Sequence, residues 1–84
     1  MRIDVTQDDI NRGVHCAGTM CPVALAVNRA TGRHCRVSAA LITFHEGGCF
    51  SPVREVREFI YAFDDRLPVA PFSFDIPDEI LVPA

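Results

Sequence analysis

Residues 51–65, SPVREVREFIYAFDD, are the clearest helix in the sequence and decide its fold. Their apolar side chains recur at spacings of three and four residues, which places them on one face of an α-helix. Ser51 is the expected N-cap, and Pro52 suits the first turn because its missing N–H has no helical partner there. The predicted inward-facing residues are Val53, Val56, Phe59, Ile60 and Phe63. Because a helix with one apolar face has to cover another element, this stretch predicts a layered domain.

Two more helices are predicted upstream of this stretch. Thr6 and Asp9 form a capping box, which starts a helical turn or two that stops at Gly13. A second helix has Pro22 at its first position, and Gly32 is placed to end it in the left-handed conformation. Because its side chains are mostly apolar, we expect this second helix to be largely buried.

Alternating polar and apolar residues predict the strands. Residues 2–5 form a short half-buried strand, residues 35–44 form the longest strand, and residues 49–50 begin a returning strand after a tight turn. The apolar side of the longest strand switches near Ala39, so we expect either a bulge or two covered faces there. Residues 72–76 form the last strand, which we expect to pair with another strand, the first being a candidate.

The resulting order, β-α-α-β-β-α-β, predicts an α+β fold in a single domain that spans residues 1–84. We expect a small antiparallel or mixed sheet of about four strands, with two to three helices on one face. Residues 77–84 are expected to form an extended tail that either packs on the domain or docks elsewhere. Either a dimer or a monomer with a covered edge strand fits this pattern.

Composition narrows the function classes. The chain has 49% hydrophobic residues and a net charge of −3, and all eight basic residues are arginines. Because these arginines are scattered, we do not expect direct binding of nucleic acid, which needs a clustered basic face. No apolar run is long enough to span a bilayer, and the first residues do not resemble a signal peptide. These features predict a cytoplasmic protein that does not bind a membrane.

Acidic residues gather in the last quarter of the chain, where Arg66 is the only basic residue. The acidic residues after position 63 are Asp64, Asp65, Asp75, Asp78 and Glu79. Such an excess forms either a solvated surface or a patch that faces a basic groove on a partner. Asp64 and Asp65 also end a helix, where the dipole disfavours negative charge, so we expect something other than helix stability to hold them there.

Cysteines and histidines form the one polar set that could bind a metal. A Cys3His zinc site is one interpretation, and buried cysteines that act as small hydrophobic residues are the other. The candidate ligands are Cys16, Cys21, His45 and Cys49, with Cys35 and His34, or His15, as substitutes. Cys35 and Cys49 flank a hairpin and could face each other, in which case they would form a disulfide only on oxidation.

Cys21 could instead be a nucleophile, because a helix N-terminus lowers the pKa of a thiol and His15 is near in sequence. A Cys/His pair also needs an orienting third group and an oxyanion site, and no residue of the sequence identifies either. The alternative is a buried cap residue. We therefore expect a protein that is not an enzyme and needs no cofactor.

Two stretches resemble short uncharacterised proteins of bacteriophages and other mobile elements in GC-rich bacteria. They are residues 1–32, with the capping box and the CPVALA helix, and residues 57–75, which begin REFIYAFDD and close PVAPFSFD. Small acidic proteins of this kind include anti-CRISPR inhibitors. The resemblance implies a non-enzymatic inhibitor whose partner is a host protein or ribonucleoprotein effector complex.

Overall fold

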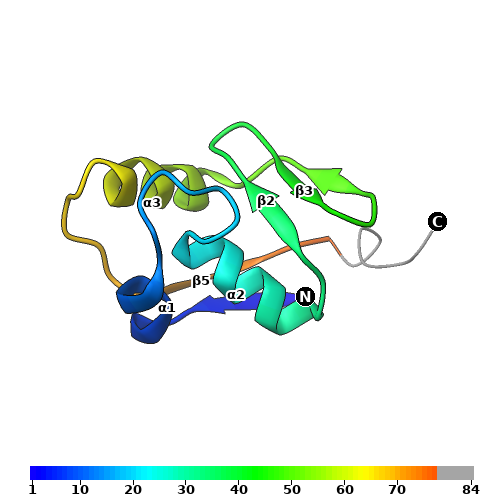
Figure 1. Ribbon diagram of the computed structural model, residues 1–84, viewed down its shortest axis with the longest axis horizontal. Helices are drawn as coiled ribbons and strands as arrows, with labels where there is room; N and C mark the ends of the chain where they lie inside the picture. Colours follow the sequence, from blue (N-terminus) through cyan, green and yellow to red (C-terminus); the bar gives the residue numbers. More distant parts are fainter. Residues whose placement is uncertain (78–84) are drawn as a thin grey trace.

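The computed structural model describes residues 1–77 and has an α+β fold, as predicted (Figure 1). Within these residues the elements are β1 (Arg2–Val5), α1 (Gln7–Arg12), α2 (Pro22–Thr31), β2 (Cys35–Val37), β3 (Ile42–Phe44), β4 (Cys49–Phe50), α3 (Arg54–Asp64) and β5 (Phe72–Asp75). Among the helices of this described part, none has the length and apolar character needed to cross a membrane. The predicted tail falls mostly on residues 78–84, which lie outside the described residues.

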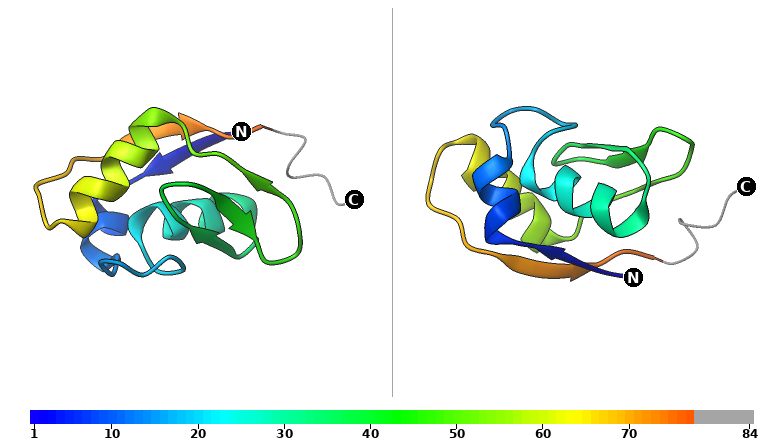
Figure 2. Two further views of the ribbon diagram at one scale, coloured as in Figure 1. Left: turned by 90° about the horizontal axis from the view of Figure 1, so that it is seen from above. Right: turned by 60° about the horizontal axis from the view of Figure 1, so that its bottom comes forward.

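The strands form two small antiparallel sheets rather than one sheet of about four strands. One sheet pairs β1 with β5, and the other has the order β2-β3-β4. Figure 2 shows β1 and β5 side by side although they come from opposite ends of the sequence, which confirms the predicted pairing of first and last strands. Helix α2 contacts β1 of the first sheet and β2 of the second, so it joins the two sheets.

The predicted long strand over residues 35–44 is wrong, because the chain reverses in its middle. Ser38 closes this reversal: its N–H donates to the Leu41 carbonyl, and its hydroxyl accepts the Leu41 N–H at 3.0 Å. Residues 35–37 and 42–44 therefore become the antiparallel neighbours β2 and β3. The switch of apolar side near Ala39 marks this turn, and neither a bulge nor a doubly covered strand is present.

Helix starts follow the capping residues closely, with one exception. Thr6 caps α1 with both bonds of the capping box, Cys21 caps α2, and Gly32 ends α2 at φ 69°. The exception is α3, whose N-cap is Val53 instead of Ser51. The chain stays extended through Val53, at ψ 164°, and the Pro52 carbonyl accepts a hydrogen bond from Arg57 Nη1 at 2.7 Å instead of from a helical N–H. Val53 is consequently 44% exposed, so the prediction that it faces inward is wrong.

The core lies between the helices and the inner faces of both sheets. Its members are Ile3, Val5, Cys21, Val23, Ala24, Ala26, Val27, Cys35, Val37, Ile42, Phe44, Val56, Phe59, Ile60, Phe63, Phe74 and Ile76. Among residues 1–77 the only buried charged residue is Asp9, which is 2% exposed. A buried carboxylate has to be fully hydrogen-bonded, and Asp9 is.

Asp9 and Arg29 form a bidentate ion pair that joins α1 to α2. Arg29 Nη1 lies 2.5 Å from Asp9 Oδ1, and its Nη2 donates both to Asp9 Oδ2 and to the Asp4 carbonyl at 2.9 Å. The Thr6 N–H and hydroxyl also donate to Asp9 Oδ2, at 2.9 and 3.1 Å. The carboxylate is therefore satisfied by the N-cap of α1 and by α2, and the same guanidinium also holds β1 through the Asp4 carbonyl.

Replacing Arg29 should destabilise the fold strongly, because it leaves the buried Asp9 carboxylate without its counter-ion. We expect Arg29→Met to lower the free energy of unfolding by about 3 kcal/mol. Arg54→Met is the matched control, because Arg54 pairs with Glu58 on the exposed face of α3. This control should lose no more than about 0.5 kcal/mol. Urea denaturation measures both, and equal losses would contradict a special role of the Asp9 pair.

Asp9 should also make stability fall in acid. Burial alone would raise the pKa of Asp9, but the hydrogen bonds from Arg29 and Thr6 outweigh burial and hold the pKa below its ordinary value. The folded state thus keeps Asp9 ionised where the unfolded state takes up a proton, so stability is lost as the pH falls through that range. Between about pH 5 and pH 2, Asp9→Asn should show a shallower decline in unfolding free energy than the parent protein. Identical pH slopes would disprove this assignment.

Candidate functional site

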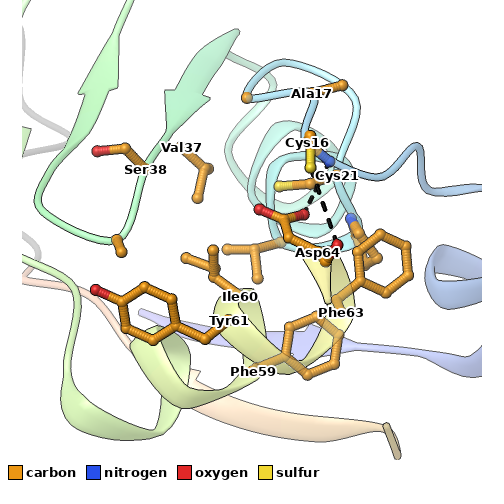
Figure 3. A pocket seen from close by; sticks show the side chains of 14 residues that line it. Cys16, Ala17, Cys21, Val37, Ser38, Phe59, Ile60, Tyr61, Phe63 and Asp64 are labelled. Atoms are coloured by element: carbon orange, nitrogen blue, oxygen red, sulfur yellow. Dashed lines mark hydrogen bonds between the residues drawn. The ribbon is translucent and has the colours of Figure 1, made fainter. Parts of the chain in front are cut away.

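A cleft of about 300 Å³ opens between α3, the loop that precedes α2, and the end of β2 (Figure 3). Its apolar lining includes Val23, Val37, Phe59, Ile60 and Phe63. Its polar groups are the side chains of Ser38, Tyr61 and Asp64 with the thiols of Cys16 and Cys21. A concave apolar surface with a few polar groups at its edge is the usual form of a binding site.

The loop of residues 13–21 forms one wall of the cleft and is held at several points. At its start, a Cβ atom added to Gly13 would lie 2.5 Å from the Pro22 ring, so the close approach requires glycine. In its middle, the Gly18 carbonyl accepts the Val37 N–H at 2.7 Å, which ties the loop to β2. Cys16 has a left-handed backbone, with φ 57°.

Asp64 anchors this loop to the end of α3. Its Oδ1 accepts the Cys16 N–H at 2.9 Å, and its carbonyl lies 3.9 Å from the Cys16 thiol. This bond gives the physical reason for an acidic residue where the helix dipole disfavours one. Asp64 is half-buried and serves the loop, whereas the adjacent Asp65 is exposed.

The structure divides the predicted acidic set. Asp64 and Asp65 lie at the C-terminal end of α3, whereas Asp75 lies at the end of β5, opposite Arg2 in the sheet register. Figure 1 places these two chain positions toward opposite ends of the molecule. Asp78 and Glu79 lie outside the described residues. The described acidic residues therefore form no single patch, and α3 ends beside the cleft while β5 does not.

Exposed apolar side chains precede and follow Asp65 in the chain. Tyr61, on the rim of the cleft, is 64% exposed, and Leu67 is 54% exposed. We call Tyr61, Asp64, Asp65 and Leu67 the α3 terminal surface. Tyr61 is not among the site residues predicted from the sequence, although its position carries a signal. It follows Arg54 and Arg57 at helical spacing, so a large aromatic ring stands on the helix face that carries these two arginines.

The Cys/His pair of the nucleophile hypothesis has structural roles. His15 stacks on Phe63 with ring centroids 4.3 Å apart, so its ring takes part in packing. Cys21 is buried, and its Sγ accepts the Ala24 N–H at 3.5 Å. Burial raises the pKa of Cys21 and outweighs the helix N–H groups, and the charge of Asp64 raises it further. The expectation of a lowered thiol pKa is therefore wrong.

The candidate zinc ligands are distributed over separate places. Cys16 and Cys21 line the cleft, His45 lines another cavity, and Cys49 is exposed on β4. Residues 1–77 include no group of three or more His, Cys, Asp or Glu side chains that could hold a metal ion.

The predicted facing of Cys35 and Cys49 is wrong. Strand β3 separates β2 from β4, with Cys35 opposite Phe44 and Cys49 opposite Thr43. Cys35 is buried while Cys49 is exposed, and all four cysteines are free thiols.

Alkylation should separate the four thiols into two classes. Cys16 and Cys49 are exposed, whereas Cys21 and Cys35 are buried, and burial raises the pKa of Cys35 to about 12. Because the thiolate is the reactive form, iodoacetamide at neutral pH should modify Cys16 and Cys49 well before the buried pair. Peptide mass spectrometry gives the rates, with urea-unfolded protein as the control in which all four react. A Cys21 rate equal to that of Cys49 would contradict this assignment.

Comparison with known proteins assigns no family to this geometry. No family model, no curated protein and no solved structure matches the chain.

Proposed function

We propose that the protein is a non-enzymatic inhibitor of the anti-CRISPR type, which docks its α3 terminal surface on a basic surface of a host CRISPR effector complex. The observation that carries the proposal is the exposure of Tyr61, Asp65 and Leu67 at the end of α3, beside an apolar cleft that Tyr61 lines. Within residues 1–77 the Asp65 side chain has no hydrogen-bond or ion-pair partner. Tyrosine is among the residue types that most often dominate binding energy at protein interfaces.

The parts of this surface have complementary tasks in binding. Tyr61 and Leu67 supply apolar area that a partner can cover, and the cleft can receive one apolar side chain of the partner. Asp65 carries the charge that selects a basic partner and speeds the encounter. Asp64 keeps the loop against α3 through the Cys16 N–H, so the wall of the cleft is in place before binding.

The chemistry of the cleft favours binding over thiol catalysis. The thiol of Cys21 is buried with a raised pKa, which disfavours the thiolate that a nucleophile needs. The ring of His15 stacks on Phe63, where it contributes to packing.

The type of partner follows from charge and from the resemblance of residues 1–32 and 57–75 to proteins of mobile elements. Effector complexes hold nucleic acid in grooves lined by arginine and lysine. An acidic surface with an aromatic anchor complements such a groove and competes with the phosphates that normally occupy it. The whole chain carries a net charge of −3, which fits a partner of this charge.

The test is phage plating on bacteria whose CRISPR system targets the phage, across several CRISPR types, with the protein expressed in the same cells. Wild-type protein should restore plating against at least one type. Tyr61→Ala and Asp65→Lys should each lose at least about tenfold of that restoration, as expected for interface hot spots. Affinity of the purified variants for the same effector complex should fall in parallel.

Glu55→Lys is the matched control, because it makes the same charge change on an exposed position of the same helix. It should retain wild-type inhibition, and urea denaturation checks that all variants fold. If Tyr61→Ala and Asp65→Lys inhibit like wild type, the α3 terminal surface is not the docking site. If wild type inhibits no CRISPR type, the proposed class of partner is wrong.

A further inference from the structure

The outer face of the β2-β3-β4 sheet gathers hydrogen-bond donors. In the register of β2 and β3, Arg36 lies opposite Thr43, and Cys35 lies opposite Phe44. Just beyond this last pair, the His45 N–H donates to the His34 carbonyl at 2.8 Å. Because side chains alternate across a strand, positions 34 and 36 share a face, as do positions 43 and 45. Cys35 and Phe44 are buried, so the face that carries these polar side chains is the one exposed to solvent.

These side chains line one cavity of about 580 Å³, together with Thr19 from the loop before α2. We call Thr19, His34, Arg36, Thr43 and His45 the donor face. Among the residues that the structure describes, no side chain of the donor face has a hydrogen-bond or ion-pair partner. The cavity is within the size range of small-molecule sites.

Charge distinguishes this cavity from the rest of the molecule. Its lining includes no carboxylate, and the nearby Glu46 lies 3.9 Å from Arg33 as an ion pair. In the sequence, no acidic residue occurs between Asp9 and Glu46. Within residues 1–77, Arg2, Arg12, Arg29, Arg33 and Arg54 each pair with an acidic side chain, whereas Arg36, Arg57 and Arg66 do not. An unpaired guanidinium among imidazoles and hydroxyls has the chemistry of an oxyanion site.

We propose that the donor face binds a phosphate group, either inorganic phosphate or the phosphate monoester of a small molecule such as a nucleotide. The guanidinium of Arg36 can donate two parallel hydrogen bonds to two oxygens of one phosphate group. This planar fork matches the geometry of phosphate and carboxylate oxygens. His34, just before β2, and His45, just after β3, supply ring N–H groups, and Thr43 supplies a hydroxyl beside Arg36. Donors from several directions suit the tetrahedral phosphate group. This site lies on a different sheet from β1 and β5 and does not depend on the α3 terminal surface.

The experiment titrates the full protein with inorganic phosphate, adenosine 5′-monophosphate and adenosine, followed by nuclear magnetic resonance of backbone and side-chain signals. Inorganic phosphate and the nucleotide should both shift the signals of His34, Arg36, Thr43 and His45, and adenosine should not. Arg36→Gln should weaken phosphate binding at least about tenfold, as expected for loss of a charge-assisted bidentate contact. His45→Gln, just after β3, should also weaken it.

Arg66→Gln is the matched control, because Arg66 is an exposed arginine that also forms no ion pair within residues 1–77 and lies outside the cavity. It should bind phosphate as wild type does. Tighter binding of the nucleotide than of inorganic phosphate identifies a nucleotide site, and equal affinities identify a site for the phosphate group alone. The proposal is overturned if phosphate leaves the donor face unshifted, if adenosine binds as well as its monophosphate, or if Arg36→Gln and Arg66→Gln weaken binding equally.

Discussion

The ion pair between Asp9 and Arg29 is the constraint on which the rest of this structure depends. A domain of 84 residues has a limited apolar core, so it can bury a carboxylate only if every oxygen has a donor. Asp9 meets this condition through Arg29 and Thr6, and the same guanidinium also holds the Asp4 carbonyl at the end of β1. One charged group thereby fixes a strand and two helices in relation to one another.

The position of the candidate site follows from this arrangement. Helix α1 ends against the start of α2, where Gly13 contacts the Pro22 ring. The loop that joins the two helices therefore begins and ends at this contact. The loop then reaches α3, where Asp64 accepts the Cys16 N–H. The cleft beside the α3 terminal surface is consequently built by contacts between segments far apart in sequence. Burial of the adjacent Cys21 keeps its thiol protonated and suits a packed wall better than a reactive centre.

Signals within a few residues made much of the fold predictable, whereas contacts between residues far apart in the sequence could not be predicted. The capping box of Thr6, the C-terminal Gly32 and the alternation in β1 and β5 each follow from chemistry within a few residues. The reversal inside residues 35–44 depends on side-chain bonds of Ser38 and contains no glycine or proline. Asp64 looked like part of an acidic patch, because its partner is 48 positions away. The donor face was not predicted either, because the sequence predicts one strand over residues 35–44, whereas the hairpin of β2 and β3 brings its side chains together.

The two proposed binding surfaces lie on different parts of one small scaffold, and docking through the α3 terminal surface can be tested by cross-linking. A benzophenone side chain installed at position 61 should cross-link to a bound CRISPR effector complex on illumination. The same group at position 53, which is also exposed but lies at the other end of α3, should not. Cross-links from position 61 alone would agree with docking through the α3 terminal surface. Cross-links from position 53 alone, or from neither position while the complex remains bound, would contradict it.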